Sequence, residues 1–161
     1  MNDFVIINLE YSKKNILIDE DISIDCVECF IEIGLKKINL PRSICNQIEV
    51  LCVFSKSNEY LIITGDSSNT LIIIDLYNSV ILKEYTLKRC SDVSWNEFQV
   101  VGIDYLLFIY EHGVLVFDVS LNLILSKYHP YIDTTFKGFL NGNIFFFNEY
   151  LGNWEYKLPK I

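Results

Sequence analysis

A repeated phrase constrains the fold of this chain more than any other feature of its sequence. The phrase has two apolar runs, separated by a short polar break and closed by an aspartate. Its two clearest copies are 60–63 and 71–74 with Asp75, and 105–108 and 114–117 with Asp118. The closing aspartates are 43 residues apart, and a period of roughly 40–45 residues is typical of four-stranded propeller blades. The repeat predicts a chain built from copies of one β unit.

Further copies are shorter or less regular. One runs from 138 to 148 around Asn141-Gly142, a pair that favours a tight two-residue hairpin turn. A possible first copy joins 5–7 to 16–18. Because another apolar run follows each closing aspartate, at 80–82 and 123–125, each unit should contain three or four strands.

The sequence therefore predicts an all-β fold of antiparallel meander units that resemble propeller blades. A partial propeller and an open twisted sheet or sandwich both fit, since the register is irregular and 161 residues allow at most four units. We expect one all-β domain over 1–161, and its repeat-like units are expected at about 1–45, 46–90, 91–132 and 133–161. Pro41 with 42–45 predicts a single helical turn.

Composition bounds the class of protein. Apolar residues make up 51% of the chain but come in short runs, far below the roughly 18 residues of a membrane helix, and no secretory signal precedes them. This favours a cytoplasmic protein without membrane contact. The net charge of -8, with few clustered cations, disfavours nucleic-acid binding and favours a basic protein partner.

Five cysteines cannot all pair within one chain, which favours free thiols in a reducing compartment. Cys26 and Cys29 have the CxxC spacing of a zinc site. However, six residues separate Cys45 from Cys52, and on a strand Cys26 and Cys29 would point to opposite faces. We expect no metal and no cofactor.

No catalytic motif accompanies the repeat, so we expect no enzymatic activity. His112 lies in a predicted hairpin turn, where a polar residue is expected for solvation alone, and His129 precedes Pro130 in a predicted loop. A nucleophile elbow, a phosphate-binding glycine loop and a zinc-binding histidine pair are all absent from the sequence.

Carboxylates and aromatic residues supply the candidate partner-binding sites. Asp21 and Asp25 share one face at strand spacing and follow other carboxylates, although a solvated edge or turn is the simpler explanation of them. Trp95 between two carboxylates is the preferred aromatic anchor, and packing between repeat units is its structural alternative. The candidate partner-binding residues are Asp19, Glu20, Asp21, Asp25, Asp92, Trp95, Glu97 and Glu111.

The segment 106–118, followed by 121–124, resembles a repeat of small immunity proteins from bacterial contact-dependent growth inhibition and polymorphic toxin systems. This resemblance covers about residues 58–160. It implies a cytoplasmic protein that binds a cognate toxin domain, commonly a nuclease, and covers its basic active-site or substrate-access surface. The alternative is a propeller-like protein-binding scaffold without a toxin-neutralising role.

Overall fold

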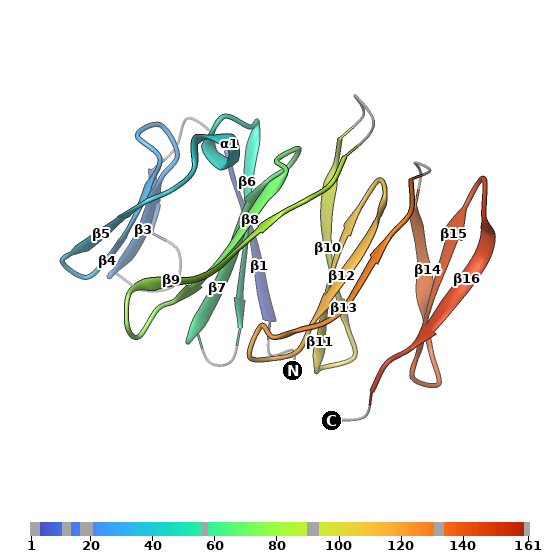
Figure 1. The fold of residues 1–161 in the computed structure, drawn as a ribbon. Helices are drawn as coiled ribbons and strands as arrows, with labels where there is room; N and C mark the ends of the chain where they lie inside the picture. Colours follow the sequence, from blue (N-terminus) through green and yellow to red (C-terminus); the bar gives the residue numbers. More distant parts are fainter. Residues whose placement is uncertain are drawn as a thin grey trace. The chain divides into compact units, whose positions relative to one another are not determined.

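Antiparallel strands dominate the computed structural model, which describes residues 4–10, 14–16, 21–55, 58–89, 94–130 and 134–159 (Figure 1). The predicted all-β fold of meander units is confirmed. The described residues form four sheets, each open at both edges, and one short helix. They also contain no helix that combines the length and the apolar character needed to cross a membrane.

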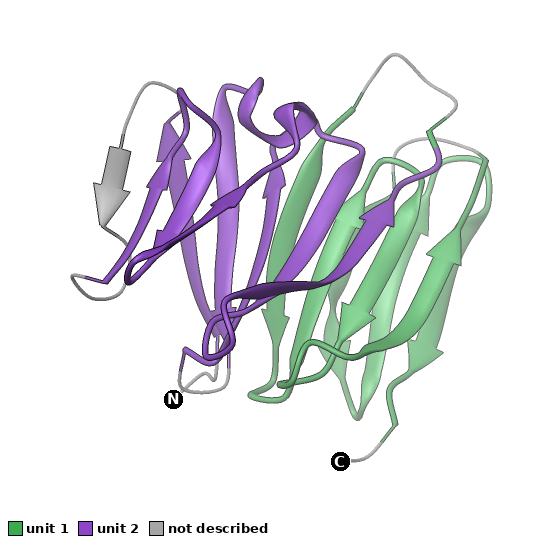
Figure 2. Cartoon of the chain, turned by 60° about the vertical axis from the view of Figure 1, so that its left-hand side comes forward, with its two compact units in different colours: residues 1–2, 89–161 green, residues 3–88 purple. Residues whose placement is uncertain are grey.

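The chain divides into two compact units, residues 3–88 and residues 1–2 with 89–161 (Figure 2). In the first unit the elements are β1 (Phe4–Glu10), β2 (Lys14–Ile16), β3 (Ile22–Asp25), β4 (Phe30–Ile33), β5 (Lys36–Asn39), α1 (Arg42–Cys45), β6 (Glu49–Ser55), β7 (Tyr60–Gly65), β8 (Thr70–Asp75) and β9 (Val80–Thr86). In the second they are β10 (Asn96–Val101), β11 (Tyr105–Tyr110), β12 (Gly113–Phe117), β13 (Leu123–Tyr128), β14 (Thr135–Leu140), β15 (Asn143–Asn148) and β16 (Gly152–Lys157).

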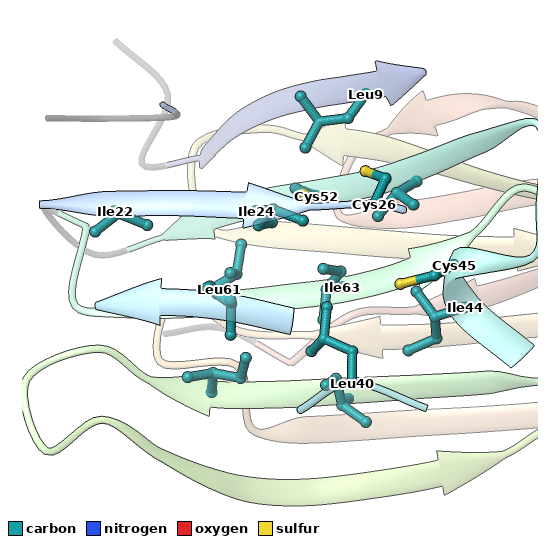
Figure 3. Packing of buried hydrophobic residues seen from close by; sticks show 14 of the residues in the cluster. Leu9, Ile22, Ile24, Cys26, Leu40, Ile44, Cys45, Cys52, Leu61 and Ile63 are labelled. Carbon is teal, nitrogen blue, oxygen red and sulfur yellow. The ribbon is translucent and has the colours of Figure 1, made fainter. Parts of the chain in front are cut away.

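The unit of residues 3–88 packs two sheets, β2-β3-β4-β5 and β1-β6-β7-β8-β9, around one apolar core. Ile22 and Ile24 from the first sheet join Cys52 and Ile63 from the second in this core, and Ile44 of the predicted helical turn α1 joins them (Figure 3). Strands β7 and β8 are buried along almost their whole length. That burial explains why their sequences are continuous apolar runs instead of an alternation.

Strand β1 departs from the expected repeat. We expected 5–7 to open the first unit beside 16–18, but β1 pairs with β6 over seven positions, from Phe4 opposite Ser55 to Glu10 opposite Glu49. Strand β6 is buried over most of its length, so an unpaired edge there would leave backbone groups without partners. Strand β2 is short and pairs with β3 instead.

The unit that contains residues 89–161 packs the sheet β10-β11-β12-β13 against the three-stranded sheet β14-β15-β16. Leu107 and Val116 of the first sheet share a core with Ile144 and Phe146 of the second. The ring of Trp154 stacks on Phe146 with centroids 4.3 Å apart. Both tryptophans of the chain, Trp95 and Trp154, pack against this core.

The predicted Asn141-Gly142 hairpin is confirmed between β14 and β15. Both residues adopt positive φ angles, 53° and 79°, as a tight two-residue turn of this type requires. Glycine tolerates this conformation because it has no Cβ, and asparagine is among the few other residues that adopt it readily.

The closing residue of each repeat holds the turn that follows it. Its side-chain oxygen accepts hydrogen bonds from backbone N–H groups of that turn, which is the usual reason for Asp or Asn at such a position. The bonds run from Asn78 to Asp75 (3.0 Å), from Ser120 and Asn122 to Asp118 (2.9 Å each), and from Tyr150 and Leu151 to Asn148 (2.9 and 3.2 Å). The repeated aspartate is therefore a structural residue.

The cysteine prediction is partly wrong. Cys29 and Cys45 form a disulfide with Cα atoms 5.6 Å apart, which links the turn after β3 to α1. The CxxC segment is that turn, not a strand, and Cys29 has a positive φ of 62°. Among the described cysteines, Cys26 and Cys52 are free and buried, as expected (Figure 3). Burial, and then Asp25, raises the pKa of the Cys26 thiol to about 11, which makes it unreactive.

Candidate partner-binding groove

A groove of about 290 Å³ lies between the two sheets of the second unit. One wall is Trp95, Glu97 and Gln99, from β10 and the residue before it. The other wall is 134–136, from β14 and the residue before it. We call this feature the β10–β14 groove. It contains Trp95 and Glu97, two of the residues that the sequence singled out for partner binding.

Strand geometry places the first wall. Side chains alternate between the faces of a strand, so Trp95, Glu97 and Gln99 all point to one side of β10. On the opposite side Phe98 is buried and packs on Phe108 with ring centroids 5.2 Å apart. The face that carries Glu97 is thereby left for the groove, and the side chain of Glu97 is exposed.

Glu111 accepts a backbone hydrogen bond from each wall of the groove. Its Oε2 accepts a hydrogen bond from the backbone N–H of Trp95 at 3.4 Å, and its carbonyl oxygen accepts one from the N–H of Thr134 at 3.2 Å. The carboxylate itself is fully buried and pairs with Arg89, whose Nη1 lies 2.6 Å from Oε2. Arg89 also donates to the side chain of Asn96. Glu111 therefore supports the groove and is not exposed to a partner.

The charge of the groove comes from one carboxylate. Among the lining residues that the structure describes, Glu97 is the only ionisable side chain, and its Oε1 accepts a hydrogen bond from the amide of Gln99. Thr134 is buried, and its Oγ1 has no hydrogen-bond partner. A cationic side chain in this groove would therefore meet a carboxylate and the indole of Trp95.

The two histidines lie near the same hairpin. The expectation that His112 is present for solvation is wrong, since it is fully buried and its Nδ1 lies 3.0 Å from the carbonyl oxygen of His129. The ring of His129 packs on Trp154 with centroids 5.0 Å apart. Burial, and then Lys127, lowers the pKa of His129, so its imidazole is neutral at physiological pH.

The acidic stretch near the start of the chain lies in the other unit. Asp21 is exposed in the turn before β3. Asp25 ends β3, and its Oδ1 accepts hydrogen bonds from the N–H groups of Val27 (3.1 Å) and Glu28 (3.0 Å). Asp25 therefore has the same turn-holding role as the closing residues of the repeats. Asp19, Glu20 and Asp92 lie outside the described residues.

A second hollow of about 350 Å³ lies at the hairpin ends of the first unit, where Glu59, Asp75 and Tyr77 line it. Hydrogen bonds from the backbone and side chain of Asn78 lower the pKa of Asp75. This carboxylate is already used by its turn, so the hollow offers less to a ligand than the β10–β14 groove. No cluster of three or more His, Cys, Asp or Glu with metal-binding geometry occurs among the residues that the structure describes.

The sequence singled out Trp95 and Glu97, which both line the groove, because an aromatic beside carboxylates is a recognisable pattern. It missed Arg89, Gln99 and the wall at 134–136. The carboxylate that Arg89 pairs with is 22 positions away, and no local signal marks such a contact. No known protein family, curated protein or solved structure gives a significant match to this chain.

Proposed function

We propose that this protein is an immunity protein: it binds a cognate toxin domain and neutralises it without enzymatic activity of its own. The observation that carries the proposal is the β10–β14 groove, which presents Trp95 and Glu97 and has no cation among the lining residues that the structure describes. The net charge of -8 adds a long-range attraction for a basic partner. A toxin that acts on nucleic acid presents such a basic surface.

In this proposal a lysine or arginine of the toxin pairs with Glu97 and packs against Trp95. The Arg89–Glu111 pair holds the backbone of Trp95 in place, so the groove is formed before the toxin arrives. Preorganisation of this kind reduces the ordering cost of binding. The toxin's active-site or substrate-access surface is then covered by the immunity protein. The cytoplasm is the proposed site of action, where a nuclease would find its substrate.

Cytoplasmic thiols are normally kept reduced, so the Cys29–Cys45 disulfide would be open to reduction at this site of action. Cys29 and Cys45 belong to the unit of residues 3–88, whereas every residue of the groove belongs to the other unit. We therefore propose that reduction of the disulfide leaves toxin binding unchanged.

Growth rescue tests the proposal. The toxin domain encoded by the neighbouring upstream gene is expressed from an inducible promoter, together with this protein or a variant. Wild type should restore growth. Trp95→Ala, Glu97→Lys and the combined charge reversal of Asp19, Glu20 and Asp21 should each reduce rescue while the purified variants stay folded. If wild type gives no rescue, the proposed function is wrong; if all three variants rescue fully, the toxin binds another surface.

A further inference from the structure

All four sheets end with the same backbone hydrogen bond. The residue after the last strand donates its N–H to the carbonyl of the residue just before the next-to-last strand. The four bonds are Leu40 to Cys29 (3.0 Å), Leu87 to Asn69 (2.7 Å), His129 to His112 (2.6 Å) and Leu158 to Gly142 (2.8 Å). Because the bond is the same in each sheet, it shows which strands of the four sheets correspond to one another.

In that alignment β15 corresponds to β4, β8 and β12, and β14 corresponds to β3, β7 and β11. The asparagine that ends β15 agrees, because Asn148 holds its turn as Asp75 and Asp118 hold theirs. In the other three sheets a further strand, β2, β6 or β10, precedes these elements. The described residues contain no such strand for the last sheet, in which β14 forms an edge.

The β10–β14 groove lies beside this open edge. Its walls are the start of β14 on one side and the face of β10 that carries Glu97 on the other. A strand that paired with the start of β14 would occupy the groove. Edge strands are the usual sites at which a further strand adds to a sheet.

In the other unit, a strand from a distant segment of the chain extends the edge of a sheet. Strand β1 pairs with the outer edge of β6 over seven positions, although β6 begins 39 residues after β1 ends. We propose that an extended segment of the partner protein adds to β14 as the first strand of this sheet, and that it directs a lysine or arginine side chain at Glu97.

The groove favours a basic segment over a neutral one. Side chains of an added strand alternate, so those that point toward β10 meet Trp95, Glu97 and Gln99. The N–H of Thr134 already donates to the carbonyl of Glu111, and a bulge between Phe136 and Gly138 interrupts the register of β14. Pairing with an added strand is therefore expected at residues 135 and 136.

The test uses a displayed library of random ten-residue peptides, selected on the purified full-length protein. We expect enriched peptides to carry lysine or arginine at alternate positions. Bound peptide should slow the hydrogen exchange of the backbone amides of residues 135 and 136, whereas the amide of Thr134 is already hydrogen-bonded to Glu111 in the free protein. Glu97→Lys should weaken binding about tenfold or more. Glu155→Lys is the matched control. Glu155 is also an exposed carboxylate, but it lies on β16, the edge of the sheet β14-β15-β16 that is opposite β14.

Three results would overturn the inference: no enriched peptide, protection confined to amides other than those of residues 135 and 136, or an equal effect of Glu97→Lys and Glu155→Lys. The inference rests on the proposed function only for the identity of the partner. If the protein neutralises a toxin but hydrogen exchange at residues 135 and 136 does not slow, the proposed function stands and strand addition is wrong. If a peptide pairs with β14 but the protein does not restore growth in the presence of the toxin, strand addition stands and the proposed function is wrong.

Discussion

Removing Arg89 should destabilise the unit that holds the groove. In the native protein Glu111 is fully buried, and its carboxylate accepts hydrogen bonds from Arg89 and from the N–H of Trp95. Among the residues that the structure describes, the variant Arg89→Ala leaves that buried carboxylate with only the longer bond from Trp95, at 3.4 Å. Asn96 also loses its donor. An uncompensated buried charge is one of the largest single penalties in protein stability.

The size of the effect follows from burial. Breaking a buried ion pair by removing one partner costs about 3–5 kcal/mol, whereas an exposed pair is worth about 0–1 kcal/mol. The side chain of Arg89 is 9% exposed and that of Glu111 is 0% exposed, so this pair belongs to the first class. With a urea m-value of about 1–3 kcal/mol/M, the midpoint of unfolding should fall by at least about 1 M.

Tryptophan fluorescence during urea unfolding measures this directly, because both tryptophans pack in the affected unit. The double variant Arg89→Met with Glu111→Leu is the control: it removes the charge together with its partner and should recover much of the lost stability. A loss below about 1 kcal/mol in Arg89→Ala would refute the argument, since the pair would then behave as a solvent-screened one.

Three further predictions concern stability. Reducing Cys29–Cys45, or replacing both cysteines by alanine, should cost the unit of residues 3–88 about 3 kcal/mol by circular dichroism, because the bond closes a loop with a sequence separation of 16; an unchanged midpoint would contradict this. The lowered pKa of His129 means that the unfolded chain takes up its proton first as pH falls. The free energy of unfolding should therefore decrease as pH falls below about 6.5, and this dependence should be weaker in His129→Gln. Finally, Gly113→Ala should cost at least about 2 kcal/mol in urea unfolding, because its Cβ would lie 1.9 Å from the carbonyl oxygen of Lys127; a neutral effect would show that β13 yields.

Much of the fold was predictable because its determinants are local. The Asn141-Gly142 turn needs two positive φ angles, which few residue pairs supply, and the pair therefore identifies the hairpin from sequence alone. The closing residues are equally local: Asp75 holds a turn that ends only three positions later. Short-range requirements of this kind are present in the sequence itself.

The misplaced predictions all depend on long-range contacts. Glu111 and His112 form a polar hairpin turn, which is normally solvated, yet both are buried because Arg89 and the backbone of His129 supply partners. The pairing of β1 with β6, and of Cys29 with Cys45, likewise joins segments whose proximity no local pattern encodes. The wall of the groove at 134–136 was missed for the same reason.

The most direct test of the central claim is titration calorimetry of the full-length protein against the toxin domain encoded by the neighbouring upstream gene, at low and high salt. The account predicts tight one-to-one binding that weakens as salt increases, and weaker binding by Glu97→Lys than by Glu155→Lys at low salt. Absence of binding at micromolar concentrations, or binding that is insensitive to both salt and Glu97→Lys, would contradict it.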